Sequence, residues 1–294
     1  SIGNGVQVLQ AANTGITSLQ KLVDTAKSIA NQALQTPSGY TTKATATIVG
    51  TSAATGAAAT STIDDLTGGA TTPSLLDGAV MTFTKTDGST AAITIGGTAV
   101  AYDPAAGTAT VKSLADLNKA LSDAGVSVVA SLTDGKTLTF TSTNDHASQS
   151  VAAASADNTI GFTATGGTVD VTKGTPVADG DSQNTRAGLI AQYNKVVEQI
   201  KTTAQDASFN GVNLLNGDQL KLVFNETGKS TLTIEGVVFD PAGLGLASLT
   251  AGTDFLDNAN ANTILDKLNN ASSTLRSQAS AFGSNLSVVQ IRQD

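Results

Sequence analysis

Apolar residues near the N-terminus recur at alternating intervals of three and four, and this pattern limits the possible fold more than any other feature. Over residues 4–34 the stripe consists of Leu9, Ala12, Ile16, Leu19, Val23, Ala26, Ala30 and Ala33. Such spacing is that of a coiled-coil seam, which is narrower than the apolar face of an ordinary globular helix. A helix of about thirty residues would span about 45 Å, whereas globular helices usually have about 10–14 residues. The sequence therefore predicts a long helix that ends at Pro37-Ser38-Gly39.

Two more long helices are predicted in the second half of the chain. From Thr253 onward, an apolar stripe consists of Ile264, Leu268, Ala271, Leu275, Phe282 and Val289. Gln278 and Asn285 interrupt this stripe, where polar seam residues fix register at a cost in stability. Either Asp254 or Asp257 could cap the N-terminus of this helix. The other helix covers residues 184–207, with its inward positions at Leu189, Tyr193, Val196, Ile200 and Ala207.

Residues 40–183 have a different pattern. Segments of alternating polarity flank the hairpin-turn dipeptides Asp87-Gly88 and Asp134-Gly135. Between the two predicted hairpins, residues 113–124 predict a short amphipathic helix with a capping box made by Ser113 and Asp116. Residues 40–183 are therefore predicted to form an α+β domain, inserted into a helical domain made of residues 1–39 and 184–294. A further hairpin, over residues 219–224 and 230–234, belongs to the helical domain by its position.

The composition excludes several classes of function. The chain has no cysteine, and His146 is its single histidine, so thiolate sites and zinc sites with two histidines cannot form. The net charge is −8, and the sixteen basic residues are scattered, which matches a nucleic-acid backbone poorly. No apolar run reaches the roughly 20 residues that span a bilayer, and the N-terminus does not resemble a signal peptide. We expect no catalytic residue, cofactor, metal, nucleic-acid partner or membrane span.

A few polar features could indicate a site, but each has a simpler explanation. His146 lies in a polar segment and is expected to be a solvated loop residue. Asp64-Asp65, and Glu226 with Glu235, do not match a calcium-binding loop, so surface or turn roles are favoured. Two glycine pairs lack the residues that accompany phosphate-binding loops and are expected to lie in turns; they are Gly96-Gly97 and Gly166-Gly167.

The most specific motif follows the helix predicted over residues 184–207. It is Phe209-Asn-Gly-Val-Asn-Leu-Leu-Asn-Gly217, and it precedes a predicted hairpin. Gly211 and Gly217 permit positive φ, while Phe209, Leu214 and Leu215 are expected to pack onto the helices. This segment closely resembles the flagellin motif that joins the second rod helix to a β-hairpin. The residues that define this turn motif are Phe209, Asn210, Gly211, Asn213, Leu214, Leu215 and Gly217.

Other segments extend the resemblance to flagellins. Residues 12–23 resemble the first rod helix, and residues 275–286 resemble the last. Residues 111–140 are similar to a strand–helix–hairpin repeat of the outer domains of flagellins and hook-associated proteins. The resemblance implies a multidomain α and β protein, in which a coiled-coil-like rod domain with a β-hairpin carries an inserted, solvent-exposed α+β outer domain. The expected seam of the rod consists of Leu9, Ile16, Leu19, Val23, Leu189, Tyr193, Val196, Ile200, Ile264, Leu268, Leu275 and Phe282.

The resemblance also implies a function and a set of partners. Flagellins assemble through heterologous contacts that propagate as a helix, so other flagellin subunits, the export machinery and the filament cap are the expected partners. The protein would be exported without a cleaved signal peptide and lie in the flagellum or at the bacterial cell surface. Flagellins have further amphipathic segments at both ends, so we expect this chain to be a monomeric core fragment. Candidate inter-subunit contacts are Arg186, Arg276 and Arg292.

Three alternatives to a filament subunit stay open. The first is a flagellin-like surface protein that captures an extracellular ligand, such as a polysaccharide, through residues 40–183. The second is a hook-associated junction protein, which the match over residues 209–217 makes less favoured. An enzyme is the most remote alternative, because no constellation of catalytic residues is present in the sequence.

Overall fold

The computed structural model describes residues 2–50, 68–69, 72–73, 78–85, 87–96, 108–133, 137–152, 159–165 and 169–293. This part of the chain is mixed α and β, with four α-helices and several small sheets. It divides into two compact units. Unit 1 consists of Ser1–Pro37 and Asn184–Asp294, and unit 2 of Ser38–Gln183.

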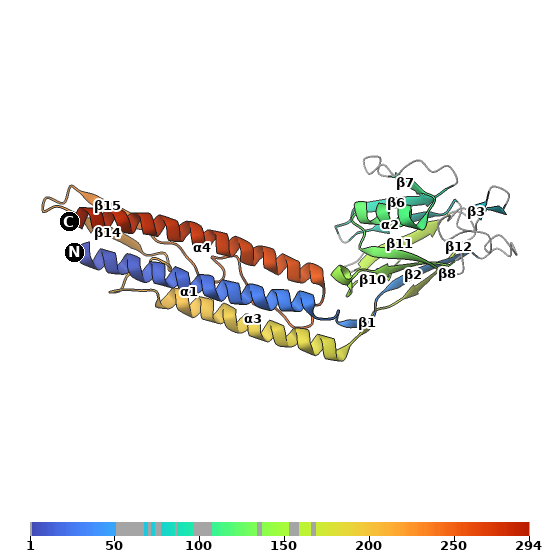
Figure 1. The fold of residues 1–294 in the computed structure, drawn as a ribbon, viewed down its shortest axis with the longest axis horizontal. Helices are drawn as coiled ribbons and strands as arrows, with labels where there is room; N and C mark the ends of the chain where they lie inside the picture. Colours follow the sequence, from blue (N-terminus) through green and yellow to red (C-terminus); the bar gives the residue numbers. More distant parts are fainter. Residues whose placement is uncertain are drawn as a thin grey trace. The chain divides into compact units, whose positions relative to one another are not determined.

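Three long helices dominate unit 1: α1 (Ile2–Gln35), α3 (Gly180–Asp206) and α4 (Asn258–Gln293). The long helices predicted near the two ends of the chain are thus confirmed. Figure 1 shows α1 and α4 side by side and antiparallel, with both termini at the end where the hairpin lies. Helix α3 begins four residues earlier than predicted, because the Asp179 carboxylate accepts hydrogen bonds from the N–H (3.3 Å) and the hydroxyl of Ser182.

Helix α4 begins later than Thr253, and the two aspartates before it have different roles. The Asp254 carboxylate accepts the N–H of Thr250 at 2.7 Å, which holds residues 250–254 in a turn. The carbonyl of Asp257 accepts the N–H of Ala261 at 3.3 Å, the first helical bond of α4. Of the two cap candidates, Asp257 therefore occupies the position before the helix.

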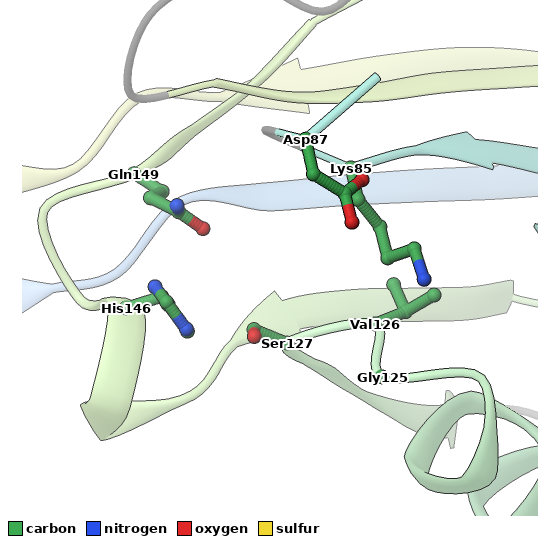
Figure 2. Close-up of a pocket in the computed structure, with 7 residues that line it drawn as sticks. All are labelled: Lys85, Asp87, Gly125, Val126, Ser127, His146 and Gln149. Atoms are coloured by element: carbon green, nitrogen blue, oxygen red, sulfur yellow. The ribbon is translucent and has the colours of Figure 1, made fainter. Parts of the chain in front are cut away.

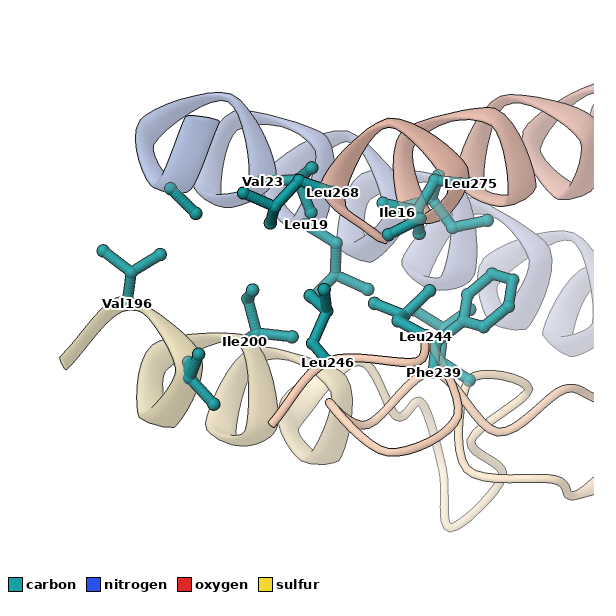
Figure 3. Packing of buried hydrophobic residues seen from close by; sticks show 14 of the residues in the cluster. Ile16, Leu19, Val23, Val196, Ile200, Phe239, Leu244, Leu246, Leu268 and Leu275 are labelled. Carbon is teal, nitrogen blue, oxygen red and sulfur yellow. The ribbon is translucent and has the colours of Figure 1, made fainter. Parts of the chain in front are cut away.

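One apolar cluster fills unit 1, and all the predicted seam residues lie buried in it. Residues 236–257, which have no regular period in the sequence, also contribute to this cluster. Phe239, Leu244 and Leu246 from that segment pack between α3 and the pair formed by α1 and α4 (Figure 3). The amide of Asn194 on α3 holds the segment in place, because it donates to the carbonyl of Leu249 at 2.9 Å and accepts the N–H of Leu249 at 2.8 Å.

The hairpin of unit 1 consists of β14 (Gln219–Val223) and β15 (Thr231–Glu235), paired antiparallel. Leu220, Leu222 and Ile234 are its buried side chains. Leu222 packs against α1 at Gly5, where a Cβ atom would overlap the leucine side chain. The hairpin is thereby attached to α1 close to its N-terminus.

The two larger sheets of unit 2 lie around one apolar cluster. A five-stranded sheet has the order β10-β11-β5-β6-β7 and a four-stranded sheet the order β12-β2-β9-β8. The strands are β2 (Thr45–Gly50), β5 (Val80–Thr84), β6 (Thr90–Ile95), β7 (Thr108–Val111), β8 (Val128–Thr133), β9 (Thr137–Ser142), β10 (Ser150–Ala152), β11 (Thr159–Thr165) and β12 (Val169–Gly174). Phe83 of β5 meets Phe140 of β9 edge to face, with ring centres 5.3 Å apart. A short pair, β3 (Gly68–Gly69) and β4 (Thr72–Pro73), occurs between β2 and β5 in the chain.

The local signals read in the sequence of unit 2 have structural counterparts. Strands β5 and β6 pair around Gly88, whose φ is 80°. Helix α2 (Leu114–Asp123) begins after Ser113, whose hydroxyl accepts the N–H of Asp116 at 3.0 Å. Strands β8 and β9 also pair as predicted, although the Asp134-Gly135 turn lies outside the described residues. Two short strands, β1 (Tyr40–Thr42) and β13 (Val177–Ala178), pair antiparallel where the chain enters and leaves unit 2.

Candidate functional site

The connection from α3 to β14 contains the predicted turn motif, and Asn213 is the residue that organises it. This side chain is 6% exposed. Its amide nitrogen donates to the carbonyls of Ala204 (2.8 Å) and Gln205 (3.0 Å), and its Oδ1 accepts the N–H of Leu215 (2.9 Å). Carbonyls in the last turn of a helix have no partner within the helix. Asn213 therefore completes the end of α3 and fixes the direction of the following chain.

A tight turn lies between α3 and Asn213. Phe209 and Val212 exchange N–H···O bonds of 3.0 and 3.1 Å across Asn210 and Gly211. Both central residues have positive φ, 51° and 81°, as a type I′ turn requires. Gly217 also has positive φ, at 85°. The two motif glycines thus adopt the backbone conformation that the sequence predicted.

One packing expectation for the motif is wrong. Leu214 and Leu215 are fully buried, as expected, but Phe209 is 37% exposed. The reason is its position on the flank of the turn, where residues 208–211 are all exposed. The motif therefore contributes two leucines to the core of unit 1 and leaves one aromatic side chain at its surface.

Helix α1 approaches the turn motif closely at Gly15. A Cβ atom on Gly15 would lie 2.7 Å from both the Ala207 Cβ and a Leu215 methyl carbon. Beside this contact the surface is hollowed between α1 and the end of α3, with Thr14 and Thr203 among the lining residues. Glycine at position 15 is thus needed for the close packing of α1 on the turn motif.

Arg186 lies inside unit 1, with 1% of its surface exposed. Its Nε and Nη2 donate to the carbonyls of Pro37 (3.0 Å) and Thr36 (3.1 Å), just after α1, and Nη1 donates to the carbonyl of Phe255. Burial lowers the pKa of the guanidinium, and the charge of Asp257 opposes this shift. The guanidinium therefore joins the end of α1, the start of α3 and the segment before α4. Because its N–H donors are not accessible to a neighbouring molecule, Arg186 is not a contact between subunits.

The other two arginines lie at the surface of α4. Arg276 is exposed, and its Nη2 donates to the Ser272 hydroxyl at 3.3 Å. Arg292 is also exposed, and its guanidinium carbon lies 4.9 Å from the ring centre of Phe224. Both keep guanidinium surface accessible, so they stay candidates for contacts between subunits.

Unit 2 contains a pocket of about 170 Å³ where three connections meet. Lys85 and Asp87 come from the β5–β6 turn, Gly125, Val126 and Ser127 from the segment between α2 and β8, and His146 and Gln149 from the segment after β9 (Figure 2). His146 was expected to be a solvated loop residue, but it is half-buried at the end of a short 3₁₀ helix, Asn144–His146, and lines the pocket. No pattern in the sequence points to Gln149, because the site is formed by three connections that are far apart in the chain.

Other polar candidates are not assembled into a site among the described residues. Glu226 and Glu235 are both exposed, and Glu235 accepts a hydrogen bond from the Gln219 amide across the hairpin. No group of three His, Asp or Glu side chains suitable for a metal occurs in the described part of the chain. Gly97, Asp64-Asp65 and Gly166-Gly167 lie outside the described residues.

Comparisons with known proteins do not assign the chain to a family. No protein-family model matches it, and no curated protein matches it. Within the described residues, no helix is both long enough and apolar enough to cross a membrane.

Proposed function

We propose that this chain is the core of a structural subunit of a bacterial flagellar filament and has no enzymatic role. The observation that carries the proposal is the junction after α3. A long helix ends in an Asn213-closed turn, continues into a β-hairpin and then into a second long helix, and the junction has the sequence that resembles flagellins. In this proposal unit 1 is the coiled-coil-like rod domain, and residues 40–183 are the outer domain.

The packing of the long helices supports a rod role for unit 1. Along α1 the buried stripe alternates large side chains with alanines, such as Ala12, Ala26 and Ala30, which permit close approach of α4. Because this stripe is used inside the molecule, contacts between subunits come from the outward faces of the helices. Arg276 and Arg292 on α4 are exposed cations on such a face. Further flagellin subunits, the export machinery and the filament cap are the proposed partners, and the bacterial surface is the proposed location.

Polysaccharide capture by residues 40–183 is the competing proposal, and the described aromatic residues do not favour it. Sugar sites commonly use exposed aromatic faces. Phe83 and Phe140 are fully buried and face each other in the core of unit 2. Tyr40 is half-buried in β1. Tyr102 and the side chain of Phe162 lie outside what the structure describes.

Removal of the insert separates the two proposals, and the β1–β13 pair shows where to cut. Tyr40 and Thr42 lie opposite Ala178 and Val177 in this ladder. A short glycine-containing turn from Thr42 to Val177 can therefore replace the residues between them while this pair stays intact. The parent chain for the test carries flagellin-type terminal segments, and growth on filament seeds is measured.

The filament proposal predicts that the chain without residues 43–176 still extends the seeds. The matched control also lacks residues 43–176 but carries Asn213→Ala, which disrupts the turn motif. We expect this control to extend the filament seeds poorly. Loss of growth in the shortened chain, with its helical circular dichroism retained, would contradict the proposal and favour ligand capture.

A further inference from the structure

We infer that the pocket of unit 2 binds a small ligand through a primary ammonium group. The pocket lies at one side of unit 2, where the β5–β6 turn, the start of β8 and the segment after β9 converge. This inference does not depend on the filament proposal, since it concerns residues outside unit 1. It rests on three features of the pocket: polar side chains without partners, one accessible carboxylate oxygen, and the available volume.

The first feature is Gln149, whose side chain is buried but unused. It is 6% exposed, and no hydrogen bond of its amide group is found among the described residues. Figure 2 shows this amide directed into the pocket, opposite Ser127 and above His146. Neither the Ser127 hydroxyl nor the His146 imidazole has a side-chain hydrogen bond within the described part of the chain. Together with the Gln149 amide, these two groups are therefore available to bind a ligand.

The second feature is the carboxylate of Asp87. Its Oδ1 accepts hydrogen bonds from the N–H (2.9 Å) and the hydroxyl (2.6 Å) of Ser89. These bonds lower the pKa of Asp87, so the group is ionised at neutral pH. Both bonds use Oδ1, which leaves Oδ2 to interact with a ligand. Figure 2 shows the carboxylate on the side of Lys85, across the pocket from Gln149.

Lys85 also lines the pocket, and its ammonium is held at the end of α2. Its Nζ donates to the carbonyl of Ala124 at 2.9 Å. Ala124 is the C-terminal cap of α2, where the helix dipole is negative. Figure 2 shows the ammonium of Lys85 near Val126, on the side of Asp87 away from Gln149 and His146. The negative end of α2 thus holds the Lys85 ammonium, whose charge adds to the Ser89 hydrogen bonds in lowering the pKa of Asp87. The Oδ2 atom of Asp87 stays available as an acceptor.

The remaining groups suit an ammonium donor. A primary ammonium has three N–H donors, and the pocket offers the Asp87 carboxylate oxygen, the Gln149 amide oxygen and the Ser127 hydroxyl or the His146 ring as acceptors. The volume of about 170 Å³ is close to that of a cavity that holds benzene, with about six non-hydrogen atoms. Short amino alcohols fit both the chemistry and the size.

Ethanolamine is the probe, and the full chain is titrated with it. Binding is measured by NMR from the backbone amide shifts of Gly125, Ser127 and Gln149. Ethylene glycol, which has a hydroxyl in place of the ammonium, and glycolate, which has a carboxylate there, are the matched probes. We expect saturable binding of ethanolamine in the millimolar range and none for the two other probes.

Two variants and one control locate the binding. Asp87→Asn removes the charge from an exposed position, and Gln149→Leu removes the buried amide; each is expected to weaken ethanolamine binding about tenfold or more. Asp145→Asn removes an equal charge from the 3₁₀ helix beside His146, outside the pocket lining, and is expected to leave binding unchanged.

The inference is overturned by any of three results. These are the lack of saturable ethanolamine binding to the native chain, tighter binding of glycolate than of ethanolamine, and equal loss of binding in Asp87→Asn and Asp145→Asn. If Gln149→Leu unfolds unit 2, Asp87→Asn alone decides, since this side chain is exposed and its replacement keeps the core intact.

Discussion

Replacement of Arg186 by methionine should destabilise unit 1 more than any surface substitution. The guanidinium donates to three carbonyls in separate parts of the chain, Thr36, Pro37 and Phe255, and lies near the buried carboxyl of Asp257. Methionine fills a similar volume but donates no hydrogen bond. The carbonyls of Thr36 and Pro37 are in partly exposed residues and can bind water instead, whereas Phe255 is fully buried.

The expected loss follows from these environments. An unpaired buried acceptor at Phe255 costs about 1–3 kcal/mol. Asp257 is 4% exposed, and its charge favours the charged form of the guanidinium. We expect a decrease of about 1–3 kcal/mol in the free energy of unfolding of unit 1, set by the unpaired carbonyl of Phe255. Arg186→Lys should recover only part of this loss, since an ammonium cannot reach three carbonyls in the planar arrangement of a guanidinium.

Urea unfolding followed by far-UV circular dichroism measures this quantity. Helices α1, α3 and α4 have 34, 27 and 36 residues, against 10 in α2, so the helical signal of the described chain reports mainly on unit 1. Arg276→Met on the exposed face of α4 is the control and should change stability by less than about 0.5 kcal/mol. Equal midpoints and slopes for Arg186→Met and Arg276→Met would refute the reasoning.

Three further predictions concern unit 1. Gly15→Ala should decrease the free energy of unfolding of unit 1 by about 1–3 kcal/mol, because a Cβ would lie 2.7 Å from Ala207 and Leu215. Gly188→Ala, on the open face of α3, should increase this free energy by about 0.5–1 kcal/mol. The reverse order of the two variants in urea unfolding would contradict the packing described. Asn213→Ala should lower the free energy of unfolding by about 2–3 kcal/mol, because it removes hydrogen bonds to three backbone groups. Asn225→Ala, in the exposed hairpin loop, should lower it by less than about 1 kcal/mol in the same assay. Burial, with a smaller contribution from the charge of Asp254, raises the pKa of Tyr193 to about 12. The stability contributed by the protonated phenol is therefore complete below about pH 10 and is lost as the pH rises toward about 12. Stability measured against pH should fall less steeply over this range in Tyr193→Phe, and identical profiles would show that the phenol is not the cause.

The sequence predicted the helical part of the fold well because the signal is periodic. The stripe from Leu9 to Ala33 lies buried along α1, and the residues that begin α2 and the β5–β6 turn act locally. Each of these features depends on neighbours within a few residues. Hydrophobic period, cap and turn chemistry are therefore readable without knowledge of the tertiary structure.

Features that depend on distant segments could not be read in the same way. Arg186 occurs near the polar start of α3 and looks like a surface residue, and only the approach of Pro37 and Phe255 shows that it is buried. Residues 236–257 have no helical or strand period, yet Leu244 and Leu246 belong to the core. The pocket of unit 2 is a similar case, since Asp87, Ser127 and Gln149 are separated by long stretches of chain.

The most direct test of the filament proposal is sedimentation of this chain beside a version with flagellin-type segments at both ends, each mixed with filament seeds. The proposal predicts that the extended chain enters the pellet as filaments that contain it throughout, while the chain alone stays in the supernatant. If neither chain is incorporated, although the extended one is folded and helical, the chain is not a filament subunit and the proposal is contradicted.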